Sequence, residues 1–220
     1  MSPLLTAMVI IGSYILGSVP SAVWVGKLVH GVDVREYGSG NAGATNVFRI
    51  LGWKTAIPVL LIDAGKGFIA VKMVTLLHAL NPVGSGFIQL QILCGISAML
   101  GHVFPLFAGF KGGKGVATTA GVILAILPNP FLIAACVFFF VLFVTQYVSV
   151  SSIMAGLSFP ISVMFIFRTG NQTVIMFALA VFILILVTHR KNIERLLRGT
   201  ESKLFRFRKT EEAPEAETAR

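Results

Sequence analysis

Residues 172–188 read QTVIMFALAVFILILVT and are followed at once by the polar residues His189-Arg190-Lys191-Asn192. At 1.5 Å per residue, a helix of this length nearly crosses the ~30 Å hydrocarbon core of a bilayer. The whole chain shares this character, since its 220 residues are 55% hydrophobic and 12% charged, with a mean hydropathy of +0.86. Soluble domains have about a quarter of their residues charged. We therefore predict an all-α, polytopic membrane helix bundle.

Seven apolar runs account for most of the chain. They lie at residues 4–25, 55–79, 87–108, 116–127, 131–147, 149–167 and 172–188. Pro128-Asn129-Pro130 is predicted to form a turn between two helices, because two prolines cannot continue one, whereas Pro160 is expected only to kink its helix. The sequence favours seven transmembrane helices. Because 116–127 is too short to cross a bilayer alone, five crossings with a re-entrant pair remain the alternative.

Cations mark one side of the predicted bundle. They flank the connections near residues 27–54 and 111–114, and nine of the eighteen Lys and Arg residues follow residue 188. The positive-inside rule makes these sides cytoplasmic, with the N-terminus outside and the C-terminus inside; Arg168 is the one exception. The net charge of +9 does not indicate nucleic-acid binding, because no basic face is interleaved with aromatic residues. We expect one domain over 1–205 and a charged, disordered cytoplasmic tail over 206–220.

Three polar, glycine-rich islands interrupt the apolar runs. The first reads GSGNAGATNV over residues 38–47 and is followed by Arg49. Glycines permit turns that bare backbone N–H groups, and hydroxyl, amide and guanidinium groups donate to phosphate oxygens. This island therefore predicts a phosphate site whose ligands are Ser39, Gly40, Asn41, Thr45, Asn46 and Arg49.

The other two islands carry the same chemistry. The second is Lys111-Gly112-Gly113-Lys114-Gly115, which lacks the spacing of a P-loop but directly precedes an apolar helix. The third contains His189 and Asn192, whose spacing of three places them on one helix face at the end of the last crossing. Glu201 is expected to pair with a nearby cation. Because all three islands are predicted on one membrane face, they indicate a single anion site.

Ionisable residues inside the apolar runs form a second group of candidates. Asp63 and Lys66 are three residues apart, and such an intramembrane pair is either functional or a structural ion pair. His102 lies near the second island and either contacts substrate or bonds a carbonyl. Cys94 and Cys136 have no neighbours at metal-ligand spacing. We predict neither a metal nor a cofactor.

The three islands resemble, in order and content, the motifs of the bacterial integral-membrane acyl-phosphate:glycerol-3-phosphate acyltransferases, the PlsY family. The matching segments are 38–49, 101–118 and 189–201, and the resemblance covers about residues 10–205. By motif, it implies that Ser39, Arg49, His189 and Asn192 act in catalysis. It also implies that the second island binds the glycerol phosphate and that Glu201 is structural.

The resemblance further implies the reaction and its setting. A fatty acyl group passes from acyl phosphate to the sn-1 hydroxyl of sn-glycerol 3-phosphate, giving lysophosphatidic acid and phosphate in the first acylation of phospholipid synthesis. The site would face the cytoplasm from the bacterial inner membrane, and a soluble enzyme would supply the acyl phosphate. An organic-phosphate transporter and a purely structural membrane protein are the alternatives from other functional classes.

Three mechanisms are compatible with the sequence. Before residue 194 the only carboxylates are Asp33, Glu36 and Asp63, so a phosphate oxygen of the donor is the expected acceptor of the hydroxyl proton. The rivals are His189 as general base and a covalent acyl-Ser39 intermediate. All three require the two phosphates to be held together by the cations of the islands.

Overall fold

The computed structural model describes residues 2–80 and 86–204, and helices are the only regular secondary structure in these ranges. The predicted all-α class is therefore confirmed. The helices, in chain order, are α1 (Pro3–Gly17), α2 (Ser21–His30), α3 (Ala44–Leu51), α4 (Trp53–Leu80), α5 (Phe87–Val103), the 3-10 turn η2 (Leu106–Ala108), α6 (Val116–Ile126), α7 (Pro128–Thr145), α8 (Val148–Ile161), the π-helical turn η3 (Ser162–Ile166), α9 (Gln172–Thr188) and α10 (Arg190–Leu197).

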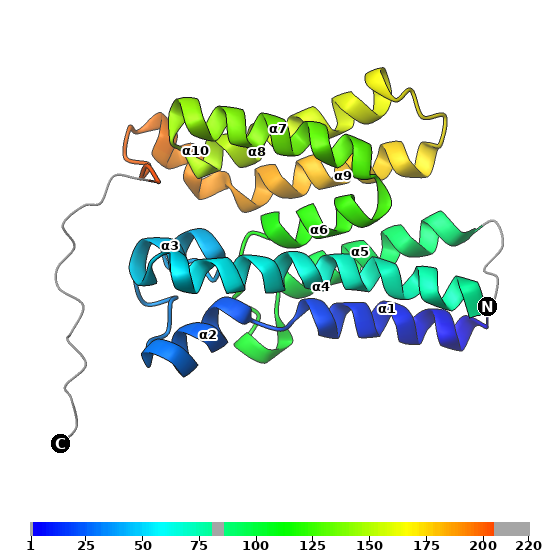
Figure 1. The fold of residues 1–220 in the computed structure, drawn as a ribbon, viewed down its shortest axis with the longest axis horizontal. Helices are drawn as coiled ribbons and strands as arrows, with labels where there is room; N and C mark the ends of the chain where they lie inside the picture. Colours follow the sequence, from blue (N-terminus) through cyan, green and yellow to red (C-terminus); the bar gives the residue numbers. More distant parts are fainter. Residues whose placement is uncertain (1, 81–85, 205–220) are drawn as a thin grey trace.

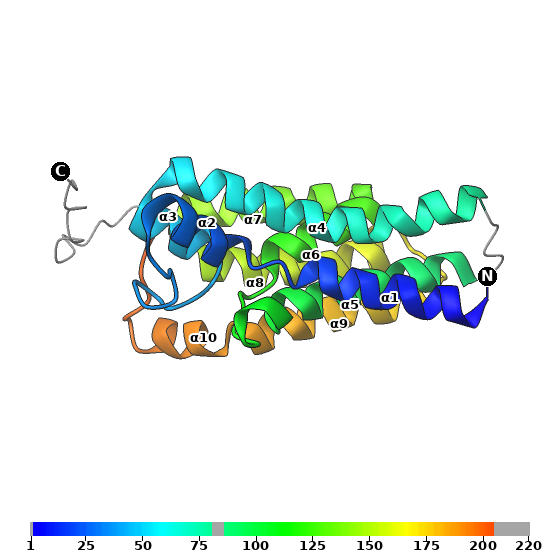
Figure 2. The same cartoon turned by 90° about the horizontal axis from the view of Figure 1, so that it is seen from below.

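The long helices run side by side along one axis, with α6 inside the bundle (Figure 1). The short helices α2, α3 and α10 gather at one end, opposite the N-terminus, and the turned view agrees (Figure 2). All three polar islands belong to this end: 38–47 leads into α3, 111–115 into α6 and 189–192 into α10. We call it the island end.

The bundle is held by an apolar core and by close helix contacts. The main cluster takes buried side chains from α4 to α9, with Phe159 and Phe177 edge to face at 6.1 Å between ring centroids. At Gly121 of α6, an added Cβ would collide with the carbonyl oxygen of Ala64 in α4. The absence of a side chain there lets the two backbones approach, as is common between helices in membranes.

Each of the seven predicted apolar runs is helical, with differences at prolines. The first run breaks at Ser18–Pro20 into α1 and α2, because Pro20 cannot continue the helix of α1. The predicted turn at 128–130 is wrong in detail: Pro128 begins α7, and only Leu127 separates it from α6. Proline is tolerated in a first helical turn, where its missing N–H would have no partner. Pro160 lies inside α8, as expected.

Length and composition qualify four stretches of the described residues as membrane spans: Pro3–His30, Phe87–Ala108, Pro128–Thr145 and Val148–Ile166. A fifth stretch qualifies if α9 and α10, which are bent by 57° relative to each other, are counted as one span. Of the remaining two runs, α4 is long but carries several charges. The 11 residues of α6 rise only about 17 Å, roughly half a bilayer core. The chain is a multi-pass membrane protein, while the count of seven and its orientation stay predictions.

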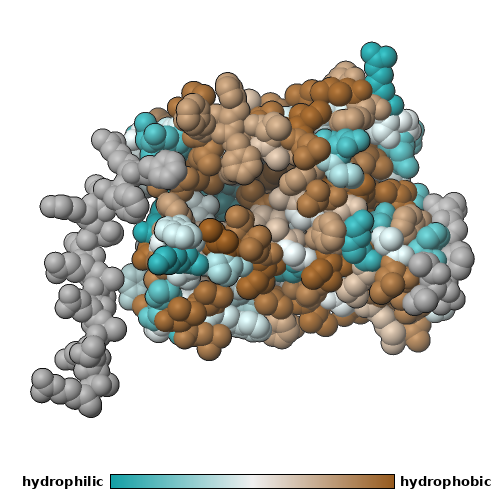
Figure 3. Space-filling model, viewed as in Figure 1, coloured by the Kyte–Doolittle hydropathy of each residue, from teal (hydrophilic) through white to brown (hydrophobic). Residues whose placement is uncertain are grey.

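The surface agrees with a lipid environment. Apolar residues dominate the face between the two ends, and polar residues gather at the ends (Figure 3). On α7, the side chains of Phe139, Phe140 and Phe143 are 66%, 70% and 86% exposed. Such exposure of neighbouring apolar side chains is unfavourable in water but not in lipid. The predicted tail over 206–220 lies outside the described residues.

Candidate active site

The first island is folded around the side chain of Asn46. Its Oδ1 accepts hydrogen bonds from the backbone N–H of Ser39 at 2.8 Å and from the Ser39 hydroxyl at 3.1 Å. Its Nδ2 donates to the carbonyls of Val34 at 2.8 Å and Tyr37 at 3.2 Å. Asn46 is 1% exposed. In this structure its amide is therefore engaged with the loop and holds Ser39 in place.

The second island packs against the end of α5. The N–H of Gly112 donates to the carbonyl of Val103 and that of Gly113 to the carbonyl of His102, both at 3.2 Å. A Cβ at Gly113 would collide with Nε2 of His102, so this position admits no side chain. In this structure these two N–H groups are therefore used in hydrogen bonds to the end of α5. The tight turn leaves Lys114 at the edge of a cavity.

The third island differs from its predicted geometry. The prediction that His189 and Asn192 share a face of one continuous helix is wrong, because α9 ends at Thr188 and α10 begins after a bend at His189. Nδ1 of His189 donates to the carbonyl of Ile185 at 2.8 Å, which leaves Nε2 without the proton. Burial and the charge of Lys114 lower the pKa of His189 to about 4, so its ring is neutral near pH 7.

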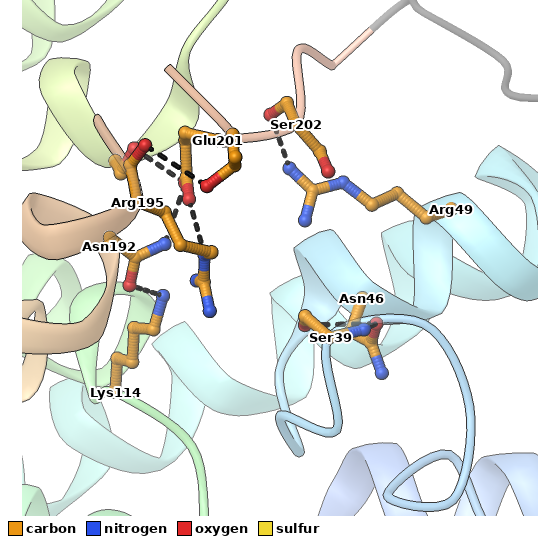
Figure 4. Close-up of polar contacts among 10 residues, drawn as sticks. Ser39, Asn46, Arg49, Lys114, Asn192, Arg195, Glu201 and Ser202 are labelled. Carbon is orange, nitrogen blue, oxygen red and sulfur yellow. Dashed lines mark hydrogen bonds and ion pairs between the residues drawn. The ribbon is translucent and has the colours of Figure 1, made fainter. Parts of the chain in front are cut away.

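A polar chain links the second and third islands (Figure 4). Lys114 donates to Oδ1 of Asn192 at 2.5 Å, and Nδ2 of Asn192 donates to Glu201 at 2.6 Å. Glu201 also accepts from Nε of Arg195 and from the hydroxyl of Ser149, both at 2.8 Å. The predicted pairing of Glu201 with a cation is confirmed. Burial opposes ionisation of Glu201, but the hydrogen bonds from Arg195 and Asn192 outweigh it and lower its pKa.

Arg49 reaches the same region from α3. Its Nη2 donates to the carbonyl of Ser202 at 3.0 Å, while its Nε is buried and has no partner among the described residues. Burial lowers the pKa of Arg49 below its usual value, although a guanidinium stays charged at any physiological pH. A buried N–H donor without a partner is costly, so it indicates a place for an anionic ligand.

A cavity of about 320 Å³ lies where the three islands meet. Its lining is Ser39, Gly40, Asn41, Val103, Phe104, Gly113, Lys114, Val187, Thr188, Arg190, Lys191, Asn192 and Arg195. This volume suits a small molecule. Burial lowers the pKa of Lys114 to about 8, and the negative charge of Glu201 opposes part of this downward shift. Because four of the lining residues are Lys or Arg, the cavity is strongly cationic.

Several predicted site residues lie outside this lining. Thr45 is half-buried in the first turn of α3, and Lys111 is exposed to the surroundings. Gly112 and Gly115 shape the second island from outside the cavity, with Gly115 in the left-handed conformation at φ +80° before α6. His189 is 2% exposed and lies behind the cavity wall.

Asp63, Lys66 and His102 form a separate buried cluster. Oδ1 of Asp63 lies 2.9 Å from Nζ of Lys66 and 3.4 Å from Nδ1 of His102, and it accepts a 2.7 Å hydrogen bond from the hydroxyl of Ser21. Lys66 also donates to the carbonyl of Val19 at 2.9 Å. The cluster thus joins α4 to the α1–α2 break and to the end of α5. This geometry favours the structural interpretation of the pair.

Arg195 is a cavity residue that the sequence interpretation missed. Cations that directly follow a membrane helix are usually interfacial anchors, yet Arg190, Lys191 and Arg195 all line the cavity. A signal was present, because Arg195 is three residues after Asn192 and so shares its face of α10.

Comparison with known proteins agrees with this arrangement. A family model described as glycerol-3-phosphate acyltransferase matches residues 7–199. The chain belongs to the glycerol-3-phosphate acyltransferase family. The predicted resemblance is thereby confirmed, and the matched range contains most of the cavity-forming residues. Membership of this family, together with the apolar helices, identifies the chain as a multi-pass membrane acyltransferase that acts on glycerol 3-phosphate.

Curated members of the glycerol-3-phosphate acyltransferase family are similar over most of their length. The protein of Salinibacter ruber is 42% identical over 216 residues, covering 92% of this chain and 93% of its own. That of Chlorobium luteolum is 40% identical over 219 residues, covering 87% of this chain and 93% of its own. Both carry the name glycerol-3-phosphate acyltransferase.

Two crystal structures of PlsY (YgiH), an integral membrane glycerol 3-phosphate acyltransferase, are similar in fold. The glycerol 3-phosphate form is 37% identical with a TM-score of 0.81, and the lysophosphatidic acid form is 36% identical with a TM-score of 0.79. Each comparison covers 90% of this chain and 94% of the other. The helix arrangement is therefore shared with these acyltransferases.

Proposed function

We propose that this glycerol-3-phosphate acyltransferase uses acyl phosphate as its donor and acylates the sn-1 hydroxyl. The hydroxyl oxygen attacks the acyl carbonyl carbon, the bond from that carbon to the phosphate oxygen breaks, and the products are lysophosphatidic acid and phosphate. One observation carries the proposal: a cavity lined by four cations, with Arg49 beside it, suits two phosphorylated substrates. Acyl phosphate is already activated, so holding the two anions together supplies most of the catalysis.

We assign roles according to the position of each residue. Lys114 and Arg49 bind phosphoryl oxygens, and Ser39, Gly40 and Asn41 contact the glycerol phosphate from the first island. Asn192 orients Lys114 through the 2.5 Å hydrogen bond, and Asn46 positions Ser39. Thr45, Gly112, Gly113 and Gly115 shape the loops, while Lys111 contributes charge from outside the cavity. Glu201 fixes Asn192, and the Asp63 cluster supports the second island through His102.

The cavity composition favours a substrate-assisted proton transfer. None of the lining residues given above carries a carboxylate or an imidazole. Ser39 donates to an amide oxygen, which cannot take its proton, so a covalent acyl-Ser39 intermediate lacks a base. His189, with a pKa of about 4, is a weaker base than a phosphate group, whose second pKa is near 6. The departing phosphate is therefore the acceptor of the hydroxyl proton.

The pH dependence of His189→Gln tests this mechanism. We expect the acidic limb of kcat/KM near pH 6 to be the same in the variant and the wild type, because substrate phosphates set it. Initial rates from pH 5 to 9, with glycerol 3-phosphate limiting, would measure it. An acidic limb near the usual imidazole pKa that is present in the wild type and lost in His189→Gln would establish His189 as the general base.

The setting of the reaction is part of the proposal. We propose that the cavity faces the cytoplasm from the bacterial inner membrane, and the cations at the island end support this orientation through the positive-inside rule. There it would receive acyl phosphate from a soluble producing enzyme and glycerol 3-phosphate from the cytoplasm. Residues 1–205 act as one membrane domain in this scheme.

A donor competition assay tests the proposed function. Purified protein receives glycerol 3-phosphate with palmitoyl phosphate, palmitoyl-acyl carrier protein or palmitoyl-CoA. We expect lysophosphatidic acid and one equivalent of phosphate from the acyl phosphate only, with the acyl group at sn-1 by NMR. Product formation from a thioester in the absence of acyl phosphate would overturn the donor assignment, and 2-acyl product would overturn the regiochemistry.

A further inference from the structure

Arg35 connects the first two islands, although it does not line the cavity. It lies in the loop between α2 and the first island, and its side chain is 27% exposed. Its Nη1 donates at 2.8 Å to the carbonyl of Ala108, the last residue of η2. The N–H of Lys111, the first residue of the second island, donates to the same carbonyl at 3.4 Å. The Arg35 side chain therefore joins the segment before the first island to the start of the second.

The carboxylate of Asp33 fixes the orientation of this guanidinium. Its Oδ1 accepts from Nε of Arg35 at 2.9 Å and from the backbone N–H of Arg35 at 3.1 Å, and its Oδ2 accepts from Nη2 at 2.7 Å. Two parallel hydrogen bonds hold the plane of a guanidinium, which leaves Nη1 for the carbonyl of Ala108. The Arg35 guanidinium also holds the pKa of the Asp33 carboxyl well below its usual range. The pair thus stays charged at physiological pH.

The two islands also touch directly, at positions that have no side chain. A Cβ at Gly113 would lie 2.8 Å from the carbonyl oxygen of Ala42, and a Cβ at Gly40 would lie 3.3 Å from the carbonyl oxygen of Arg35. Both glycines line the cavity. Backbones this close fit together in few relative positions, because a small shift produces either a collision or a gap. The hydrogen bond from Arg35 to Ala108 holds the islands in one of them.

We propose that Arg35 is a positioning residue of the acyl transfer, which holds the second island against the first so that both contact glycerol 3-phosphate at once. This assignment rests on the proposed function, in which the first island contacts the glycerol phosphate and Lys114 binds phosphoryl oxygens. Arg35 acts through these groups and does not itself contact the substrate. A displacement of about 1 Å between the islands is enough to weaken their combined effect strongly.

Binding of glycerol 3-phosphate tests the positioning role without turnover. Isothermal titration of the purified protein in detergent, with no acyl donor present, measures the affinity. We expect Arg35→Met to bind at least about tenfold more weakly than the wild type, the usual worth of a charge-assisted contact. In the acyl-transfer assay, KM for glycerol 3-phosphate should rise by a similar factor. Partial unfolding would lower the rate at every substrate concentration but leave KM unchanged, so a purely structural role gives a different result.

Arg35→Lys separates geometry from charge. This variant keeps a positive charge beside Asp33, but one ammonium cannot bind the carboxylate with two parallel hydrogen bonds and also reach Ala108. We expect its affinity for glycerol 3-phosphate to be at least about threefold weaker than that of the wild type. Wild-type affinity in Arg35→Lys would show that only the charge matters and would overturn the proposal. If Arg35→Met does not fold, Arg35→Lys alone decides.

Lys27→Met is the matched control. Nζ of Lys27 lies 3.2 Å from Oδ2 of the same Asp33 carboxylate, but this side chain is 54% exposed and comes from α2. Removing the exposed partner of an ion pair should change the affinity for glycerol 3-phosphate by less than about threefold. A loss in Lys27→Met equal to that in Arg35→Met would assign the effect to the charge around Asp33 and would overturn the role of Arg35.

Lys114→Met distinguishes a failure of this inference from a failure of the proposed function. If Lys114→Met binds glycerol 3-phosphate more weakly while Arg35→Met binds it as the wild type does, the proposed site stands and the positioning role is wrong. If Lys114→Met binds it with wild-type affinity, the role of Lys114 in the cavity is wrong, and the positioning role is overturned with it.

Discussion

Replacing Lys114 with Met is expected to lower kcat/KM by about 10²–10³-fold, the usual cost of removing one donor that stabilises developing charge. The ammonium lies in the cavity where the three islands meet and donates a hydrogen bond to Asn192. Initial rates with purified variants measure the effect. Lys54→Met, at an exposed position on α4, is the control expected to behave as wild type. Lys111→Met should show a smaller loss than Lys114→Met, because Lys111 is exposed.

The pH dependence of kcat/KM provides a second test of the role of Lys114. Because its pKa is about 8, it loses its proton as the pH rises through 8, and kcat/KM should fall there. Substrate phosphates are already dianionic at this pH and add no change. Lys114→Arg should remove the basic limb, since a guanidinium stays protonated. Equal activity of Lys114→Met and wild type, or a basic limb that survives in Lys114→Arg, would contradict this role.

Asp63→Asn is expected to lower the free energy of unfolding by about 3–5 kcal/mol, the usual cost of leaving one member of a buried ion pair uncompensated. The side chains of Asp63 and Lys66 are 1% and 3% exposed, so neither charge can turn to solvent. Reversible unfolding in mixed micelles measures the change. Adding Lys66→Met to Asp63→Asn should recover part of the loss, because the stranded ammonium is removed.

An exposed ion pair serves as the control for this experiment. Glu194→Gln breaks the pair with Arg198, whose members are 57% and 71% exposed, and it should cost less than about 1 kcal/mol. A wild-type unfolding free energy in Asp63→Asn would contradict the structural role of the cluster. Restored stability with lost activity in the double variant would instead show that Asp63 acts on the second island through His102.

Sequence patterns predicted the elements of this fold because long apolar runs in a membrane have few alternatives to helix. They did not predict the break at Pro20 or the bend at His189, since both are set by how the island end packs. The count of seven spans stays a prediction. α6 is short enough to depend on its neighbours, and α4 keeps its charges because Asp63, Lys66 and His102 satisfy one another.

For the cavity, the chemical types of the residues predicted the site better than the assumed helix geometry did. The three islands meet, and Lys114 and Asn192 are in direct contact. The role of Asn46 could not be read from the sequence, because only the folded loop shows that its amide is engaged with Ser39 and backbone carbonyls. Arg195 was missed because a cation after a membrane helix is usually an interfacial anchor. Its pairing with Glu201 depends on how the segment 199–204 packs after α10, which no local sequence pattern indicates.

The segment 199–204, which contacts Arg49, also affects the order in which contacts form during biosynthesis. Residues 199–204 follow every described helix, yet they fix Arg49, which lies in the third helix of the chain. The ribosome makes all of those helices before the carbonyl of Ser202 exists to receive the guanidinium. The contact between Arg49 and Ser202 can therefore form only after all of the described helices have been synthesised.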